Sequence, residues 1–287
     1  MMTGSQQPTG AQGALADNPI GGPIWLIGCG NMAGAMLRRW LACGLDPAQV
    51  TIVRKSGAPF AGGVTVLSSP PADAPAPALL MLGVKPQMID LVAPWVAPLL
   101  GPETLLVSIL AGVEIETLRG RFAAPRAVLR VNPNTPVALG RGVIALAGDG
   151  LDETTRGRTE ALMRPLGLVE WMDEAQIDII TALSGSGPAF LFRFIDALAQ
   201  AGAEAGLPRD QAERLALATV GGAAALAEAA GETPGKLAER VASPGGSTRK
   251  GLEVLDAADG LDALIGRTLS AAIRRNREMA AEARAQP

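Results

Sequence analysis

The sequence predicts an α/β doubly wound parallel sheet followed by an all-α domain. Short apolar runs typical of buried strands alternate with amphipathic helical stretches from residue 24 to residue 171, a pattern typical of a parallel sheet with helices on both faces. From Glu174 onward the strand pattern disappears and long apolar helical stretches replace it. At 287 residues the chain has about the length of two domains. We therefore expect a sheet domain over residues 23–172 and a helical domain over residues 173–287.

The composition excludes several kinds of chemistry. A formal net charge of −3 gives no reason to expect nucleic acid or an acidic membrane surface as a partner. Histidine and tyrosine are absent, so proton transfer must use a carboxylate, one of the four lysines, a hydroxyl, a cysteine or water. Two cysteines do not make a disulfide framework, which favours a reducing, cytoplasmic setting. No metal ion is expected.

The first 22 residues are rich in Gly, Gln, Ala and Pro and carry neither a basic start nor an apolar run. A secretory signal peptide needs both features. We therefore expect residues 1–22 to form a disordered tail.

A glycine-rich turn follows the first predicted strand, Ile24–Ile27, and leads into an amphipathic helix. Gly28, Gly30 and then Ala33 or Gly34 fit the GxGxx(G/A) fingerprint of dinucleotide-binding sites. Glycine suits this place because a tight strand-to-helix turn and a close approach of backbone to a ligand both exclude a Cβ atom. A purely structural tight turn is the alternative, but the strand before it and the helix after it favour a nucleotide.

The start of that helix is the expected contact for a pyrophosphate. The first N–H groups of a helix have no partner within it and attract anions. Asn31 is the residue that we expect to cap the helix.

Basic and hydroxyl side chains follow the second predicted strand, Val50–Val53. They are Arg54, Lys55 and Ser56. In sheets of this kind an acidic residue here holds the ribose 2′-hydroxyl of NAD, whereas an arginine accommodates the 2′-phosphate of NADP. The sequence therefore favours NADPH over NADH, and a basic solvated turn is the alternative.

The other elements of the sheet domain are expected in alternation. Strands are predicted at residues 64–67, 79–84, 104–110, 127–131, 143–147 and 168–171, and helices at residues 87–99, 114–122 and 153–163. Four prolines between Ser68 and Ala78 make a crossover helix doubtful there, so we expect an irregular or one-turn connection. Lys85-Pro86 and the rigid polar loop from Asn132 to Pro136 end two of the strands, where ligands bind in open α/β sheets.

The helical half is unusually apolar. Residues 189–205 carry only one narrow polar stripe, which consists of Arg193, Asp196, Gln200 and Glu204. Residues 215–227 form a second apolar run, too short for a bilayer span of about 20 residues. So much apolar surface on so little chain predicts dimerisation.

Two glycine loops precede helices in this half, at residues 184–188 and 243–248. Such loops bring backbone N–H groups and hydroxyls to a helix start, which makes a pocket for a carboxylate or phosphate. For either loop alone, an ordinary capped helix start is the simpler interpretation.

Six motifs in order carry a family resemblance. They are IGCGNMAGAML, GVKPQ, SILAGV, RVNPNTP, TALSGSGPAF and VASPGGST. With them the chain, from about residue 24 to residue 274, resembles pyrroline-5-carboxylate reductase. The resemblance implies NAD(P)H-dependent reduction of 1-pyrroline-5-carboxylate to L-proline, the last step of proline biosynthesis. It also implies a Rossmann domain joined to a helical dimerisation domain, a homodimer and often larger rings of dimers.

The same resemblance assigns roles to the matching residues. Those expected to bind the cofactor are Gly28, Gly30, Asn31, Met32, Ala33, Arg54, Lys55, Ser56, Val84, Lys85, Pro86, Ile109, Leu110 and Ala111. Those expected to bind the substrate are Asn134, Thr135, Gly245, Gly246, Ser247 and Thr248, with Glu174 near the imino acid. The chain departs from the family at the proline-rich residues 68–78, where relatives have a helical segment that helps contact the cofactor ribose, and at Asn132, where methionine is common.

The chemistry suits a chain without histidine or tyrosine. Reducing a cyclic imine needs a hydride on the ring carbon and a proton on nitrogen, and an iminium already carries that proton. We expect Thr248 to hydrogen-bond the ring nitrogen or its water and Glu174 to stabilise the iminium charge. Catalysis then rests mainly on orientation.

Two alternatives stay open. A β-hydroxyacid dehydrogenase shares this layout but relies on a lysine in the helical half, which here could only be Lys236 or Lys250. A non-catalytic NAD(P)-binding regulator could use the same fold, although such a sensor has no need of the loop at residues 243–248.

Overall fold

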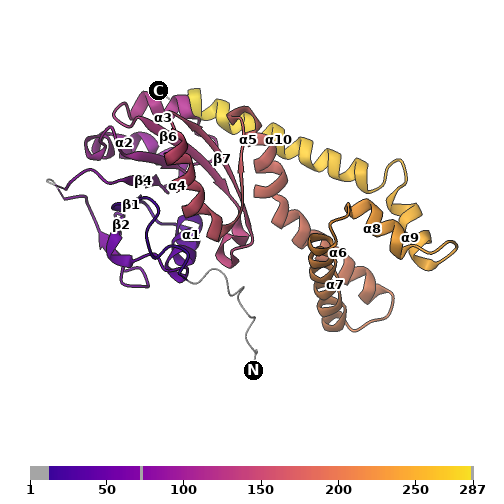
Figure 1. The fold of residues 1–287 in the computed structure, drawn as a ribbon. Helices are drawn as coiled ribbons and strands as arrows, with labels where there is room; N and C mark the ends of the chain where they lie inside the picture. Colours follow the sequence, from indigo (N-terminus) through magenta and orange to yellow (C-terminus); the bar gives the residue numbers. More distant parts are fainter. Residues whose placement is uncertain (1–12, 72–73, 286–287) are drawn as a thin grey trace. The chain divides into compact units, whose positions relative to one another are not determined.

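The computed structural model describes residues 13–71 and 74–285, which form two compact units (Figure 1). One unit contains residues 13–185 together with 273–285, and the other contains Ser186–Ala272. The domain boundary expected after residue 172 stays a prediction.

The first unit is built on one eight-stranded sheet in the order β3-β2-β1-β4-β5-β6-β7-β8. The strands are β1 Ile24–Ile27, β2 Val50–Val53, β3 Thr65–Leu67, β4 Leu79–Leu82, β5 Leu105–Ser108, β6 Ala127–Pro133, β7 Gly142–Asp149 and β8 Gly167–Trp171. In register, Ile24 of β1 lies between Val50 of β2 and Leu79 of β4, all in parallel. This confirms the predicted doubly wound sheet.

One strand pair departs from the expected parallel order. β7 runs antiparallel to β6, while every other pairing is parallel. The connection, residues 134–141, holds only a 3₁₀ turn from Thr135 to Leu139. A parallel crossover needs about a dozen residues or more, so this short connection forces the chain to turn back.

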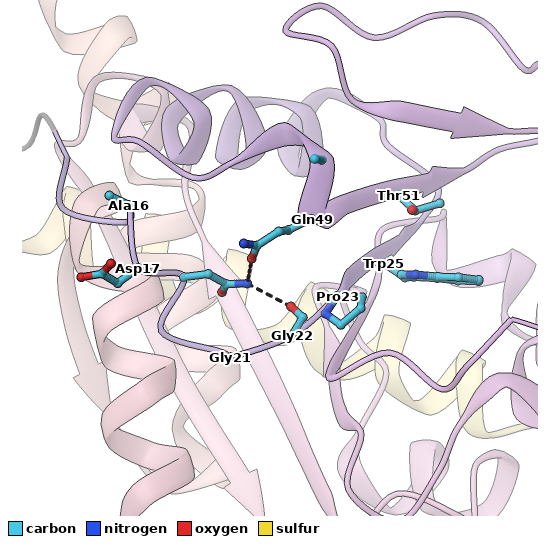
Figure 2. A pocket seen from close by; sticks show the side chains of 10 residues that line it. Ala16, Asp17, Gly21, Gly22, Pro23, Trp25, Gln49 and Thr51 are labelled. Carbon is cyan, nitrogen blue, oxygen red and sulfur yellow. Dashed lines mark hydrogen bonds between the residues drawn. The ribbon is translucent and has the colours of Figure 1, made fainter.

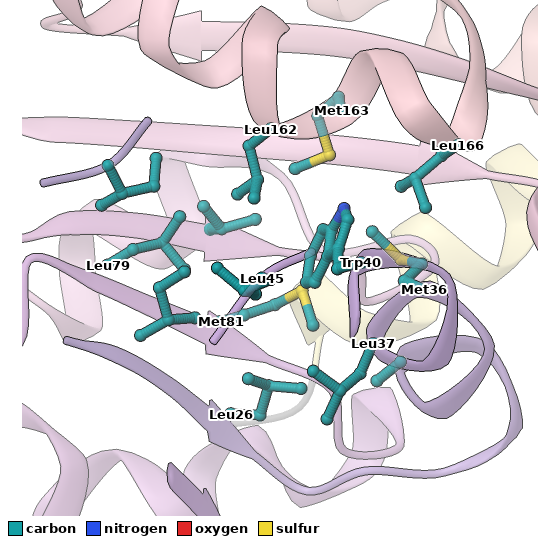
Figure 3. Close-up of a cluster of buried hydrophobic side chains, with 14 of the residues drawn as sticks. Leu26, Met36, Leu37, Trp40, Leu45, Leu79, Met81, Leu162, Met163 and Leu166 are labelled. Atoms are coloured by element: carbon teal, nitrogen blue, oxygen red, sulfur yellow. The ribbon is translucent and has the colours of Figure 1, made fainter. Parts of the chain in front are cut away.

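Helices cover both faces of the sheet, and the alternation of side chains along β1 explains why. Ile24 and Leu26 point into a core with α1, Asn31–Ala42, and α4, Glu153–Met163 (Figures 1 and 3). Trp25 and Ile27 point into the other core, with α2 and α3. The bounds are Ile89–Val96 for α2 and Ile115–Arg121 for α3.

The expected tail is partly wrong. Residues 1–12 lie outside the described residues, but residues 13–22 pack against the sheet unit. Leu15 and Ile20 are buried in the core, and the Leu15 N–H donates to the Cys43 carbonyl at 3.0 Å. Two isolated apolar residues in a polar stretch were enough to anchor this segment.

The proline-rich connection is irregular, as predicted. Neither residues 68–71 nor residues 74–78 form a helix or strand. Proline fixes φ and removes an N–H donor, so neither a helix nor a sheet ladder is available to this segment.

The helices after the sheet are α5 to α10. Their bounds are α5 Ile177–Ile180, α6 Gly187–Glu204, α7 Arg209–Ala230, α8 Pro234–Val241, α9 Ser247–Leu255 and α10 Leu261–Ala285, with a π-helical turn at Thr181–Gly185. Sequence patterns predicted α6, α7 and α9 and missed α5, α8 and α10. Within the described residues no helix is both long enough and apolar enough to cross a membrane.

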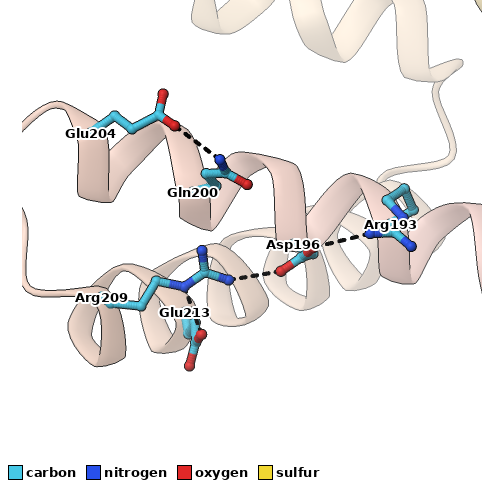
Figure 4. A network of polar contacts seen from close by, with 6 residues as sticks. All are labelled: Arg193, Asp196, Gln200, Glu204, Arg209 and Glu213. Atoms are coloured by element: carbon cyan, nitrogen blue, oxygen red, sulfur yellow. Dashed lines mark hydrogen bonds and ion pairs between the residues drawn. The ribbon is translucent and has the colours of Figure 1, made fainter.

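In the second unit, one residue of the predicted polar stripe of α6, Asp196, pairs with α7. The carboxylate of Asp196 accepts from Arg209 Nη2 at 2.8 Å, and Arg209 Nε donates to Glu213 at 2.7 Å (Figure 4). The buried contacts between these helices are small side chains, chiefly Ala199, Ala212 and Ala216. The large apolar side chains of α6 and α7 are exposed in the single chain.

Candidate functional site

The glycine turn is as tight as its sequence predicts. Gly28 has φ +77°, where other residues are strained, and a Cβ atom on it would lie 2.8 Å from Val84 Cγ1 and 3.1 Å from the backbone of Gly83. Gly83 is equally confined, since its Cβ would lie 2.9 Å from the Gly28 carbonyl oxygen and 3.0 Å from Ala33 Cβ. β1, β4 and α1 therefore meet with no room for side chains. Gly83 was not among the residues predicted for the site, and its place in the GVKPQ motif was the only sequence signal for it.

The start of α1 leaves its N–H groups to a ligand. The expected cap is wrong, because Gly30 occupies the N-cap with φ −78° and ψ −159°, and Asn31 is already the first helical residue. In the part of the chain that the structure describes, no side chain caps this helix. A Cβ on Gly30 would meet no protein atom, so this glycine leaves open space beside the helix start. This cradle fits a dinucleotide pyrophosphate.

The three residues predicted to bind the cofactor at the end of β2 differ in their contacts. Arg54 Nε donates to the Ala58 carbonyl at 2.9 Å and Arg54 Nη2 to the Pro59 carbonyl at 2.9 Å, so this guanidinium organises the following turn. Lys55 and Ser56 are exposed beside it.

The glycine turn also has a positive electrostatic surrounding. Burial raises the pKa of the Cys29 thiol, while the nearby charges of Arg54 and Arg38 act in the lowering direction. The thiol is therefore neutral at pH 7. The same two arginines favour an anion at the turn.

A pocket of about 650 Å³ opens beside the turn. Its walls come from the glycine turn, the β2 end, residues 68–70 and α2, and the lining residues are Ile27, Gly28, Val53, Arg54, Lys55, Ser56, Ser68, Ser69, Pro70, Val84, Met88, Leu91, Val92 and Trp95. None of these described lining residues is acidic. The proline-rich segment thus still reaches this pocket, although it is not the helix that the family resemblance implies.

The predicted nicotinamide side lies at the ends of β4 and β5. Lys85 and Ala111 are exposed, and Pro86 and Ile109 are half-buried. Leu110 is buried in the core around α2, so only its backbone is available to a cofactor.

In the loop after β6, the side chain of Asn134 is committed to the protein. Its Nδ2 donates to the Ser184 carbonyl at 3.0 Å, and its Oδ1 accepts from the Val143 N–H at 2.9 Å. Asn134 is 6% exposed, whereas Thr135 is exposed. Of the two residues that the sequence assigns to the substrate here, the structure leaves Thr135 accessible.

Glu174 is likewise engaged. Its Oε1 accepts from Arg130 Nη1 at 3.0 Å and from the Ile115 N–H at 2.8 Å. Arg130 lies opposite Ser108, the last residue of β5, so this ion pair is close to the carboxyl end of that strand. One carboxylate oxygen of Glu174 is thus engaged with the protein, and the catalytic role expected for Glu174 stays a prediction.

The loop at residues 243–248 in the second unit has the geometry of an anion pocket. Gly245 has φ +71°, and Gly246 is the N-cap of α9 with no described side chain capping the helix. Ser247 and Thr248 are exposed at the first two helical positions. Backbone N–H groups and two hydroxyls thus converge at one helix start.

A double ion pair braces this loop. Arg249 Nη2 and Nη1 reach the two oxygens of Glu239 at 2.6 and 3.2 Å, and Arg249 Nη2 also reaches the Ala242 carbonyl at 3.3 Å. The pKa of the Glu239 carboxyl is held below its usual value by these hydrogen bonds and the charge of Arg249. Ala242 directly precedes the loop and Arg249 directly follows it, so this hydrogen bond joins the two ends of the loop.

A second large hollow lies at the opposite edge of the sheet. It measures about 670 Å³ and lies beside the amino ends of β1 and β2, around Gly22, Trp25 and Gln49 (Figure 2). Asn18 organises it by donating to the Gly22 carbonyl at 2.9 Å and to Gln49. Ligands in open α/β sheets bind at the carboxyl ends, so this hollow is not the expected site.

The fold and the site define an oxidoreductase that binds NAD(P) on a Rossmann fold. The residues predicted to bind the cofactor gather at the carboxyl ends of neighbouring parallel strands, from β2 across β1 and β4 to β5. A family model described as "NADP oxidoreductase coenzyme F420-dependent" matches residues 23–112, and one described as "Pyrroline-5-carboxylate reductase dimerisation" matches residues 174–279.

Individual relatives agree with these matches. The pyrroline-5-carboxylate reductase of Pseudomonas aeruginosa is 38% identical over 265 residues, which cover 90% of this chain and 96% of the relative. That of Pisum sativum is 37% identical over 263 residues, 89% of this chain and 95% of the relative. The solved structure of the Coxiella burnetii enzyme matches with a TM-score of 0.82 at 32% identity, over 90% of this chain and 98% of the other. The chain belongs to the pyrroline-5-carboxylate reductase family.

Proposed function

We propose that this protein reduces 1-pyrroline-5-carboxylate to L-proline with NADPH, the last step of proline biosynthesis. The observation that carries the proposal is the loop at residues 243–248, an uncapped helix start with two hydroxyls in a chain whose other unit holds a dinucleotide cradle. A small anionic substrate and a nicotinamide cofactor are the two ligands that such a pair of sites needs.

The chain's residues act by binding and orientation. The N–H groups at the start of α1 hold the cofactor pyrophosphate, and bound NADPH supplies the hydride. The Gly246 N–H already donates to the Ser243 carbonyl at 3.0 Å. The N–H groups of Ser247 and Thr248, at the start of α9, therefore hold the substrate carboxylate. The Thr248 hydroxyl accepts a hydrogen bond from the ring N–H of the iminium. Since the iminium nitrogen already carries its proton, the chain supplies no strong acid.

In this proposal Glu174 has a structural role. With its Oε1 on Arg130 and on the Ile115 N–H, it holds the start of α3 rather than the substrate. We assign the iminium charge no carboxylate partner from this position.

One assay tests the activity against its alternatives. NADPH oxidation with 1-pyrroline-5-carboxylate is measured beside oxidation of 3-hydroxy acids with NADP⁺. Turnover of the imine alone is the expected result. Turnover of hydroxy acids would instead support the dehydrogenase, and binding of NADPH without any turnover would support the regulator.

Thr248→Ala sharpens the assignment. We expect kcat to fall roughly 10- to 1000-fold, below the full range for a lost catalytic acid because water can replace the hydroxyl. Thr248→Ser keeps the hydroxyl and serves as the matched control, with kcat close to wild type. An unchanged kcat in Thr248→Ala with intact substrate affinity would remove Thr248 from the proposal.

The preference for NADPH rests on the β2 end. Lys55 and Ser56 line the pocket, no described lining residue is acidic, and Arg54 is occupied with the turn. Lys55 is therefore the residue that we propose for the 2′-phosphate. Lys55→Ala should raise the KM for NADPH roughly 10-fold and leave the KM for NADH unchanged; an equal change in both would contradict the preference.

The lysine alternative gains nothing from the structure. Lys250 Nζ is paired with both oxygens of Glu253 at 3.0 and 2.9 Å on the same exposed helix face. Lys236 is exposed in the first turn of α8.

We further propose that the working form is a homodimer, the unit from which larger rings of dimers are built. The dimerisation match at residues 174–279 covers the helices whose large apolar side chains are exposed in one chain. Light scattering after size exclusion gives the mass directly, and a monomer at micromolar concentration would contradict this proposal.

A further inference from the structure

One face of β6 is polar although the strand lies inside the sheet. Arg130 and Asn132 alternate along the strand, so their side chains point to the same face. Asn134 follows directly after the strand with an extended backbone, φ −120° and ψ 168°, and continues this alternation. Val131, between Arg130 and Asn132, points into the core with α1 and α4. Three polar side chains on the buried face of an inner strand need partners, because unpaired polar groups there are costly.

All three partners come from one segment, residues 174–185. Arg130 Nη1 pairs with Glu174 Oε1 at 3.0 Å. Asn132 Nδ2 donates to Thr181 Oγ1 at 2.5 Å, and Asn134 Nδ2 donates to the Ser184 carbonyl at 3.0 Å. We call these three contacts the β6 ladder. Its rungs join residues 44, 49 and 50 positions apart in the chain.

The ladder holds a segment with irregular backbone. Thr181–Gly185 is a π-helical turn, a form that is rare and occurs mostly at functional sites. Hydroxyls pair with the carbonyls around it, since Thr181 Oγ1 donates to the Ile177 carbonyl at 2.7 Å and Ser184 Oγ to the Ile180 carbonyl at 3.0 Å. Asn134 Nδ2 donates to the carbonyl of Ser184, within the turn. Side-chain hydrogen bonds thus add to the backbone bonds that define this irregular turn.

Both ends of the ladder reach loops of the predicted cofactor crevice. At one end, Glu174 also accepts from Ile115, two residues after Val113 in the SILAGV motif. At the other end, Asn134 immediately precedes the accessible Thr135. Burial keeps these contacts rigid, because the Arg130 side chain is 7% exposed and Asn134 is 6% exposed.

We propose that Arg130, Asn132 and Asn134 are positioning residues, which fix the segment 174–185 and its π-helical turn against the β5 and β6 ends of the crevice. The effect on the reaction rests on the proposed function. The ladder acts on the orientation of the reactants, so it governs kcat rather than the affinity for NADPH.

Asn134→Asp tests the proposal with one changed atom. The variant keeps the oxygen that accepts from Val143 and replaces the donor to Ser184 by an oxygen that repels this carbonyl. Asn18→Asp is a matched control, because Asn18 is 5% exposed, donates to the Gly22 carbonyl at 2.9 Å and accepts from the Ile20 N–H at 3.1 Å, at the opposite sheet edge.

Four quantities are measured for both variants: melting temperature, Kd for NADPH, the kcat and KM for 1-pyrroline-5-carboxylate, and amide hydrogen exchange. Both variants should melt earlier. Asn134→Asp alone should lower kcat by roughly 10-fold or more, since small misplacements of reactants cost that much, with the Kd for NADPH within about twofold. Exchange should accelerate at residues 181–185 in Asn134→Asp and not in Asn18→Asp. Equal losses of kcat in the two variants would overturn the proposal.

A second variant guards against loss of folding in Asn134→Asp. Asn132→Met removes the Thr181 rung with a residue that relatives carry, and it should accelerate exchange at residues 181–185 and lower kcat by a smaller factor. Exchange as slow as wild type in Asn132→Met would contradict the ladder. If wild-type protein does not reduce the imine at all, the proposed function fails, and the exchange comparison still decides whether the ladder holds the turn.

Discussion

The two units of this chain bury their apolar side chains in opposite ways. In the sheet unit, large side chains such as Leu26 and Trp40 are completely buried between sheet and helices (Figure 3). In the helical unit, the buried residues of the α6–α7 contact are alanines, while Phe192 of α6 is 65% exposed. A fold covers its apolar surface either with its own chain or with another one. The sheet unit therefore has large apolar cores of its own, whereas the helical unit leaves most of its large apolar side chains to be covered by another chain.

The largest difference between the two units is expected when a charge replaces an apolar side chain in each of them. Leu26→Asp puts a carboxylate where exposure is 0%, and we expect it to cost more than about 4 kcal/mol and to yield no folded protein. Phe192→Asp should leave a folded chain but convert the dimer to a monomer. Circular dichroism and light scattering separate the two outcomes, and a dimeric Phe192→Asp protein would place the interface elsewhere.

Two glycines test whether the turn of the sheet unit serves the fold or the ligand. Gly28→Ala strains a residue at φ +77° and crowds Val84, so it should lose about 1–2 kcal/mol of stability as well as NADPH binding. Gly30→Ala meets no protein atom and has an ordinary φ of −78°. It should keep the melting temperature of wild type and weaken NADPH binding roughly 10-fold, because only the ligand meets the new methyl group. Unchanged NADPH affinity in Gly30→Ala would mean that the pyrophosphate lies elsewhere.

Trp40 gives a smaller effect within the closed core. Its Nε1 is buried and has no hydrogen-bond partner among the described residues. Trp40→Phe leaves a cavity but also removes an unpaired donor that costs about 1–3 kcal/mol, so the net change in the free energy of unfolding should lie within about 1 kcal/mol. Phe122→Leu, at an equally buried site in the other core, lacks this compensation and should destabilise more. The reverse order in chemical denaturation would indicate that Trp40 has a partner.

The smallest predicted effect is a pH dependence in the helical unit. Arg249 holds the pKa of Glu239 below its usual 4.5, so the ionised carboxylate stabilises the folded state. This contribution is present above pH 4.5 and is lost as the pH falls through the lowered pKa. The melting temperature of wild type should exceed that of Glu239→Gln at pH 7, and the difference should shrink below pH 4.5. A difference that stays constant down to pH 3 would show that the ion pair contributes nothing.

The elements that the sequence predicted well are those whose signals are local. Alternating apolar runs located all eight strands, and the glycine spacing located the turn at Gly28, because strand, turn and helix start lie within about ten residues. The segment at residues 13–22 was misjudged, since Leu15 and Ile20 are buried only by contacts with distant residues. The direction of β7 was missed because it depends on the length of one connection rather than on strand composition.

Consecutive residues were enough to predict the cradle around Gly28 in one unit and the hydroxyl loop at Ser247 and Thr248 in the other. Each is a helix start within a short stretch, so its chemistry is written in consecutive residues. Contacts between distant parts of the chain show in addition that Glu174 and Asn134, both expected at the substrate, are hydrogen-bonded within the protein, while their roles toward the substrate stay predictions. Their partners lie 44 and 50 positions away, and no local pattern says which face of a strand will meet which distant segment.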